Sequence, residues 1–391
     1  MKKVKKFQRS SKREEKWKTL VALVITIVIL IILATVTINA VFGDNGLIKK
    51  AEYARDLSSN STEAEFEGMN SLFGEFTNMM IEDSKVPEVT VPSTIEEAKG
   101  SGDTFKGTTT IKDDLNNDVT IPGGFKIASD SGTKIEEGIV IEDNAGNQFV
   151  WIPVGTYQTS SGQKINNLSR RRFTSSEATE INGDDVLDEY FYGEGNENSV
   201  AKDQIGAFKT SATTHGGFYI GRYEAGTEIS RTSSSDALNT PLVQANKNAY
   251  VYVTRDQAKA QSEAMYNGNS YVTSELVSSY AWDTALNFIC QTNTEAYLLS
   301  KTKDSAYGNL GTNTLELTGA YETDNYSNIY DFLGNCREWS TEYTNYSNGP
   351  CVDRGGYYEL DSGTASIRGS NPTNEKSSDS NTAFRLQLYI K

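Results

Sequence analysis

The sequence predicts an α+β protein with a globular head of mixed, mainly antiparallel sheets and two helices, preceded by a long N-terminal helix. Three observations predict this class. Residues 19–42 are almost wholly apolar, and residues 47–83 are mostly helix formers with one apolar stripe. From Val119 onward strand patterns are dense, and two helical patterns stand among them. A chain of 391 residues is long enough to bury a substantial core.

The N-terminal segment has the pattern of a membrane anchor. Residues 1–18 contain nine Lys or Arg and two Glu, and residues 19–42 contain no charge. An apolar run of that length spans a bilayer as a helix, and the basic flank predicts a cytoplasmic N-terminus with an extracellular C-terminal domain. We therefore expect a single-pass protein of the cell membrane. Its expected parts are a basic segment (1–18), a transmembrane helix (19–42), a helical stalk (43–83), a linker (84–118) and a head (119–391).

The stalk has an apolar stripe on an otherwise acidic helix. Phe66, Met69, Phe73 and Phe76 recur at steps of three and four residues. The stripe is consistent with packing on the head, with self-association through a second copy, or with a position on the membrane surface. The linker follows from Pro87 and Pro92 among Ser, Thr and Gly.

Charge and residue counts exclude several classes of function. The chain has a net charge of −15, and because residues 1–18 contribute +7, the rest carries −22. Such a surface repels phosphates, so no nucleic acid is expected as a partner. There is no CxxC pair for zinc, and the only histidine, His215, excludes multi-histidine metal sites.

Three motifs near the C-terminus carry a family resemblance. They are YDFLGNCREW (330–339), DRGGYY (353–358) and TAFRL (382–386). In that order they resemble YDMxGNVWEW, RGGSW and GFR of the formylglycine-generating (sulfatase-modifying factor) family, whose fold is a variant of the C-type lectin fold. FVWIPVG (149–155) and GFYIGRYEAG (217–226) resemble two further strands of that family.

The rest of the head is interpreted around these motifs. Thr254 and Gln257 form a capping box that starts a helix running to about Met265. A second helix is expected over 279–290, where apolar residues recur at helical spacing. Residues 156–207 are polar and irregular, so we expect an insertion loop with Arg170–Arg172 in solvent.

The resemblance implies an activity whose key residues are missing. Members of the family oxidise a sulfatase cysteine with copper held by two cysteines that follow the RGGS strand. Here Leu360 stands at the first of these positions and the second falls near Ser366. Without thiolates there is no soft site for copper. We therefore expect no copper and no catalytic residues, with a divergent sulfatase-modifying or oxidoreductase-type enzyme as the alternative.

Two further features follow from the resemblance. Calcium in the family is bound around the GNxWEW turn, which implies Asp331, Gly334, Cys336 and Glu338 as ligands here. The alternative is that Asp331 caps a turn and Glu338 pairs with an arginine. The resemblance also makes the strands of Cys336 and Cys351 neighbours, which would allow a disulfide, whereas the alternative is three buried, inert thiols.

The segment from Tyr357 to Thr382 is the candidate ligand-binding surface. It is rich in Ser, Asn, Asp, Thr and Tyr, and polar loops on a rigid frame make adaptable binding sites. The head also resembles the lectin-fold variable proteins of diversity-generating retroelements, whose variable residues lie in this part of the fold. An ordinary solvated loop is the alternative. The candidate residues are Tyr357, Tyr358, Glu359, Asp361, Arg368, Asn371 and Asn374.

A second resemblance concerns residues 16–54, which are similar to the N-terminal segment of type IV pilin-like proteins. Trp17, Lys18 and Ala22 depart from the pilin pattern at the cleavage point and at the acidic fifth position. We therefore expect a static anchor that displays a binding or adhesion module for an extracellular protein or glycan. A minor pilin-like subunit of a pilus or secretion system is a further alternative.

Overall fold

The computed structural model divides the chain into two compact units, Met1–Thr90 and Val91–Lys391. It describes residues 23, 26 and 27, and residues 91–391 except 174–177, 182–190, 193–198, 294–300, 303–307, 345–350, 361, 364 and 372–378. The described residues contain no helix long and apolar enough to cross a membrane. The predicted basic segment, transmembrane helix and stalk lie outside the described residues, apart from three helical positions.

The head, Val91–Lys391, is built on a six-stranded sheet in which every neighbouring pair is antiparallel. In spatial order its strands are β14 (Val272–Leu276), β21 (Leu386–Ile390), β11 (Gly217–Gly221), β5 (Gln148–Pro153), β4 (Val140–Asp143) and β3 (Phe125–Ile127). Every residue of β11 and β21 is buried, because both faces of the sheet are covered. The final strand, β21, therefore lies inside the sheet that β3, β4 and β5 begin.

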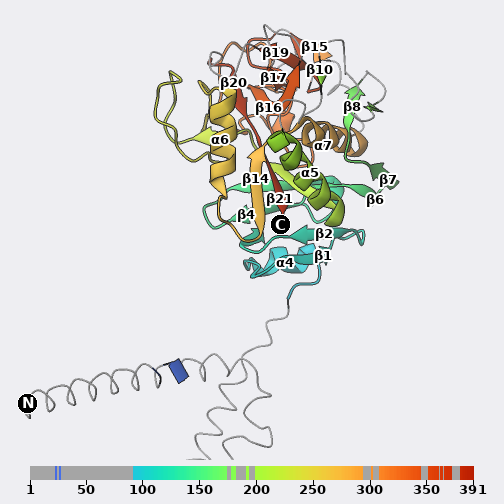
Figure 1. The fold of residues 1–391 in the computed structure, drawn as a ribbon. Helices are drawn as coiled ribbons and strands as arrows, with labels where there is room; N and C mark the ends of the chain where they lie inside the picture. Colours follow the sequence, from blue (N-terminus) through green and yellow to red (C-terminus); the bar gives the residue numbers. More distant parts are fainter. Residues whose placement is uncertain are drawn as a thin grey trace, which may run out of the picture. The chain divides into compact units, whose positions relative to one another are not determined.

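A second sheet lies at one end of the head (Figure 1). Its strands are β10 (Phe191–Tyr192), β16 (Arg337–Thr344), β17 (Cys351–Arg354) and β19 (Arg368–Asn371), with β20 (Thr382–Phe384) beside β16. The β16–β20 pair is parallel and the other pairs are antiparallel. A single residue, Arg385, separates β20 from β21, so the chain passes directly from the second sheet into the central one.

Short two-stranded sheets complete the head. They pair β1 (Thr109–Lys112) with β2 (Asp118–Ile121), β6 (Gly155–Thr159) with β7 (Gly162–Asn166), β8 (Arg170–Phe173) with β9 (Ala178–Ile181), β12 (Gly226–Thr227) with β13 (Asn248–Ala249), and β15 (Lys301–Thr302) with β18 (Ser362–Gly363). Among the described residues, the single-turn 3₁₀ helices η2 (Ile135–Glu137) and η5 (Glu322–Asp324) lie in the connections.

The described part of the head has four α-helices: α4 (Ile95–Ser101), α5 (Ser199–Thr214), α6 (Arg255–Met265) and α7 (Ser279–Thr292). The predicted helices over 254–265 and 279–290 are confirmed as α6 and α7. Thr254 caps α6 through the expected capping box with Gln257, and Ser278 caps α7. On α7, Trp282 is fully buried and stacks on Phe332 with ring centroids 4.0 Å apart.

Two expectations about this region are wrong. Part of the predicted linker 84–118 is folded, because α4 and β1 bury Ile95 and Ile111 in the same core as the sheets. The predicted insertion loop 156–207 instead contains β6 to β10 and the start of α5. Arg170 and Arg171 are buried rather than solvated.

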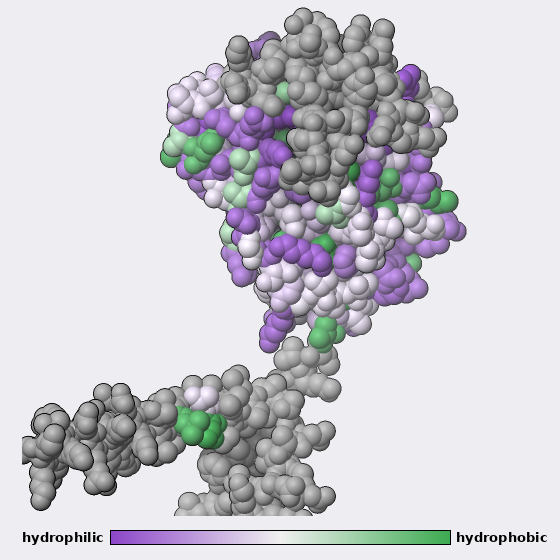
Figure 2. Space-filling view, in the orientation of Figure 1, coloured by the Kyte–Doolittle hydropathy of each residue, from purple (hydrophilic) through white to green (hydrophobic). Residues whose placement is uncertain are grey.

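The chain enters the head at the end opposite to the second sheet. Figure 1 shows α4, β1 and β2 at one end, the central sheet in the middle, and β15, β17 and β19 at the other end. On the face drawn in Figure 2, hydrophilic residues are interspersed with small hydrophobic groups over the described part of the head. Such scattered apolar residues are normal for a protein surface.

Candidate functional site

Strands β16 and β17 place different side chains on the two faces of the second sheet. Their register puts Glu338 opposite Arg354, and Trp339 opposite Asp353. Successive residues of a strand point to opposite faces. Glu338 and Arg354 therefore lie on one face, and Trp339 and Asp353 lie on the other.

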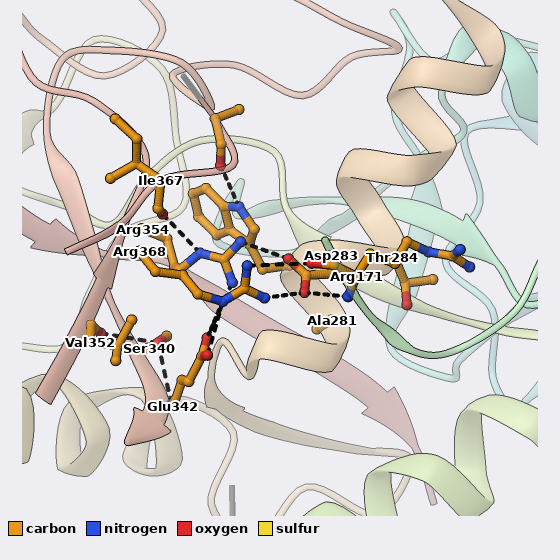
Figure 3. A network of polar contacts seen from close by, with 12 residues as sticks. Arg171, Ala281, Asp283, Thr284, Ser340, Glu342, Val352, Arg354, Ile367 and Arg368 are labelled. Atoms are coloured by element: carbon orange, nitrogen blue, oxygen red, sulfur yellow. Dashed lines mark hydrogen bonds and ion pairs between the residues drawn. The ribbon is translucent and has the colours of Figure 1, made fainter. Parts of the chain in front are cut away.

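One face is joined to α7 by a buried network of ion pairs (Figure 3). The guanidinium of Arg354 contacts Asp283 at 2.6 Å and Glu342 at 3.3 Å. Arg368 pairs with the same two carboxylates, and its Nε lies 2.9 Å from Glu342. The backbone N–H of Arg171 also donates to Asp283 at 2.8 Å. Two cations thus balance two anions, which is what makes burial of all four charges tolerable.

The side chain of Arg368 is therefore part of this buried ion-pair network. The sequence predicts it as a ligand-binding residue, but its side chain is only 10% exposed. Besides Asp283 and Glu342, it contacts the carbonyl oxygen of Arg171 at 3.4 Å. These contacts use the guanidinium to hold β8, α7 and β19 together.

A second cluster surrounds the turn before β16. Asp331 and Asn335 have positive φ angles of 57° and 62°, a conformation that Asp and Asn tolerate better than most residues. Asp331 accepts a hydrogen bond from the backbone N–H of Gly319 at 2.7 Å, and the Asn335 amide donates to the buried carboxyl of Glu224. The turn is thus held by side chains from distant parts of the chain.

The contacts of this turn do not fit calcium binding by Asp331, Gly334, Cys336 and Glu338. Both carboxylate oxygens of Glu338 accept hydrogen bonds from Arg385, at 3.1 and 2.8 Å from its Nε. Calcium takes about six to eight oxygen ligands. Within the described part of the chain, no three His, Cys, Asp or Glu residues are grouped so that they could hold a metal. The structure matches the alternative in which Glu338 pairs with an arginine.

The same cluster contains more acid than base. Burial raises the pKa of Glu224 well above its usual value, with Asp331 and Glu338 adding repulsion, and burial raises the pKa of Asp331 to about 6. Oε2 of Glu224 and Oδ1 of Asp324 are buried and have no hydrogen-bond partner among the described residues. Because Arg385 is occupied by Glu338, these carboxyl groups are best satisfied when protonated.

None of the three cysteines forms a disulfide, so the structure does not contain the Cys336–Cys351 bond that the resemblance would allow. Cys351 lies opposite Tyr343, seven residues beyond Cys336 and roughly 20 Å along the strand, too far for a disulfide. Burial raises the pKa of Cys290 to about 12 and that of Cys336 well above its usual value.

The candidate ligand-binding residues lie in the turn that follows β17 and on β19. The Tyr357 ring lies beneath the Arg337 guanidinium, 4.4 Å from its carbon, and Glu359 is exposed. Tyr358 is buried, and its hydroxyl lies 3.1 Å from that of Ser380. Asn371, at the end of β19, is the backbone register partner of Cys351 on β17. Asp361 and Asn374 lie outside the described residues.

Sequence reasoning missed several residues that matter at this site. Asp283 and Glu342 anchor the ion-pair network, Glu224 supplies the orphaned carboxyl, and Arg337 lies over Tyr357. One signal was available for Arg337, because it stands where the family pattern has an aromatic residue. The contacts of Asp283 and Glu224 join residues 71 and 111 positions apart, and those of Glu342 join residues 12 and 26 positions apart on different strands, which the sequence pattern does not indicate.

Neither a family model nor a curated protein matches the sequence. Among solved structures, the chain is similar to Treponema denticola variable protein 1, with 12% identity, a TM-score of 0.35, and coverage of 62% of this chain and 96% of that one. It is also similar to CarF, with 15% identity, a TM-score of 0.31, and coverage of 62% and 98%. At TM-scores below 0.5, neither similarity establishes a shared fold.

Replacing Asp283 by Asn is expected to destabilise the head by about 3–5 kcal/mol, because Arg354 and Arg368 would keep buried charges with one anion fewer. Urea denaturation of the full-length chain measures this change. The control is Glu228→Gln, which breaks the more exposed Lys247–Glu228 pair and should cost less than about 1 kcal/mol. Equal effects of the two variants would contradict a structural role for the network.

The buried acids predict a loss of stability as pH rises. A carboxyl with a raised pKa in the folded state stabilises fully below its unfolded pKa, and this contribution is lost as pH rises through the folded value. For Asp331, raised from 3.8 to about 6, the loss amounts to about 3 kcal/mol.

The substitution Glu224→Gln removes one titrating group and keeps the shape of the side chain. The unfolding free energy of this variant minus that of the unmodified chain is therefore expected to increase between pH 5 and pH 8, as measured by urea denaturation across that range. A difference that does not vary with pH would show that Glu224 is not protonated in the folded protein.

Proposed function

We propose that this protein is a membrane-anchored, cell-surface binding module with a catalytically inert head. In this proposal the head is a C-type lectin-like domain of the formylglycine-generating family. Two features support that finer assignment. The last strand, β21, lies between β11 and β14 in the sheet that begins with β3 to β5, and β20 reaches the second sheet just before it.

One observation carries the proposed function. The chain enters the head at α4, and the second sheet, whose strand β17 precedes the turn of Tyr357, lies at the opposite end (Figure 1). In this proposal the anchor precedes α4 in the chain, and the second sheet with the turns that follow its strands meets an extracellular partner. The network of Asp283, Glu342, Arg354 and Arg368 provides the rigid support beneath that end.

The copper-dependent alternative lacks support in the described residues. It requires two thiolates at one exposed site. Cys336 and Cys351 are buried and separate, Cys290 lies on α7, and Leu360 and Ser366 occupy the region of the family's copper-binding cysteines. Retention of a binding surface without the reactive sulfur atoms is therefore the function we favour.

The proposal is tested by probing arrays of extracellular proteins and glycans with the full-length chain. We expect a ligand whose binding falls about tenfold or more in the double variant Tyr357→Ala, Glu359→Ala, since truncation of central aromatic contacts often costs that much. Glu96→Ala, an exposed change on α4 at the opposite end, is the control.

Absence of any ligand would contradict the proposal, as would a ligand whose binding is insensitive to the double variant. Formation of an aldehyde on a sulfatase peptide would instead favour the enzymatic alternative. External protease treatment of intact cells tests the topology, because the head is expected to be cleaved while residues 1–18 stay protected.

A further inference from the structure

Arg337 is a half-buried cation in contact with the candidate binding residue Tyr357. It is the first residue of β16, and its backbone N–H donates to the carbonyl oxygen of Asn381 at 2.9 Å. Its side chain is 26% exposed. Arg337 therefore lies where three parts of the chain meet: the start of β16, the turn after β17 and the segment that leads into β20.

The guanidinium of Arg337 is held in place by stacking and makes no hydrogen bond within the described part of the chain. Its carbon lies 4.4 Å from the centroid of the Tyr357 ring, a stacking arrangement that fixes the plane of the group. Its Nη1 lies 3.7 Å from Asp353, which is beyond hydrogen-bond distance. Its Nε is buried and has no hydrogen-bond partner among the residues that the structure describes, so the exposed part of the side chain includes the Nη atoms.

Asp353 lies beneath Arg337 and cannot move toward it freely. Its side chain is fully buried on β17, and it lies against Gly369 of β19, where an added Cβ would collide with Oδ1. The space left by Gly369 thus accommodates the carboxylate. Asp353 balances the charge of Arg337 from below, and within the described part of the chain the Nη donors of the guanidinium make no hydrogen bond.

We infer that Arg337 is the specificity-determining residue of the proposed binding surface, and that it binds a carboxylate on an acidic side chain of a protein partner. The inference rests on the proposed function. A planar guanidinium matches a carboxylate through two parallel hydrogen bonds, which gives both strength and orientation. Lysine offers neither the fork nor the stacking on Tyr357.

The surroundings favour a protein over a glycan. The guanidinium covers one face of the Tyr357 ring, which makes the ring less available for stacking on a sugar. Arg and Tyr are the residues that most often dominate protein interfaces. Exposed Glu359 and the charge of −22 beyond residue 18 repel polyanions such as sulfated polysaccharides. A single, well-placed carboxylate is compatible with that field, because its contact with Arg337 is short-ranged.

The experiment selects peptides from a random display library on the full-length chain. We expect the selected peptides to share an Asp or Glu, and resynthesis with Asn or Gln at that position to weaken binding about tenfold or more. Arg337→Lys and Arg337→Gln should each lower the affinity of the acidic peptides by a similar factor. Arg172→Gln, which removes an exposed arginine from β8, should leave affinity unchanged.

Variants of Tyr357 separate orientation from folding. Tyr357→Phe keeps the stacked ring and should bind as the unmodified chain does. Tyr357→Ala removes the ring and should lose affinity for acidic peptides. Circular dichroism and thermal unfolding of each variant confirm that the fold is intact.

The outcomes distinguish this inference from the proposed function. Peptides or arrayed ligands that bind equally well to Arg337→Gln would overturn the role of Arg337 and leave the binding function standing. Failure of every peptide and arrayed ligand to bind would overturn both. Binding of carboxylated sugars through Arg337, with no acidic peptide selected, would overturn the assignment of a protein partner.

Discussion

The arrangement of the head depends on Arg385, the single residue between the second sheet and the central sheet. Its buried guanidinium donates to both carboxylate oxygens of Glu338 on β16. It also donates, at 2.8 Å in each case, to the carbonyl oxygens of Gly221 on β11 and of Tyr330. A buried cation is tolerated only when its donors are satisfied. One side chain therefore fixes the two sheets and the turn of residues 330–336 relative to one another.

Around this cation the charges of the head divide into two groups with different consequences. Beneath the second sheet, the ion pairs of Asp283, Glu342, Arg354 and Arg368 are closed to solvent and join α7 to the strands. At the start of β16, half-buried Arg337 has a long ion pair and an Nε without a hydrogen-bond partner among the described residues. The ion-pair network makes the strands beside Arg337 rigid. A rigid, preorganised site favours binding because it loses less entropy when a ligand binds.

Local signals predicted the elements that local interactions determine. The helices α6 and α7 were predictable because their caps and their apolar spacing are contained within about 15 residues. The strand β11 was predictable from its aromatic and β-branched residues. The α+β class with mainly antiparallel sheets is confirmed.

What could not be predicted depends on partners far away in the chain. The segment with two prolines has the composition of a linker, and only the packing of Ile95 in the core shows that part of it is folded. The arginines at 170–172 have the pattern of a solvated segment, and only the hydrogen bond from the backbone N–H of Arg171 to Asp283 shows that this part of the chain is buried. The separation of Cys336 from Cys351 follows from the register of β16 with β17.

A double-mutant cycle between Arg385 and Glu338 tests the central claim most directly. Urea denaturation of Arg385→Gln, Glu338→Gln and the double variant is expected to give a coupling energy above about 2 kcal/mol, whereas additive effects would contradict the account.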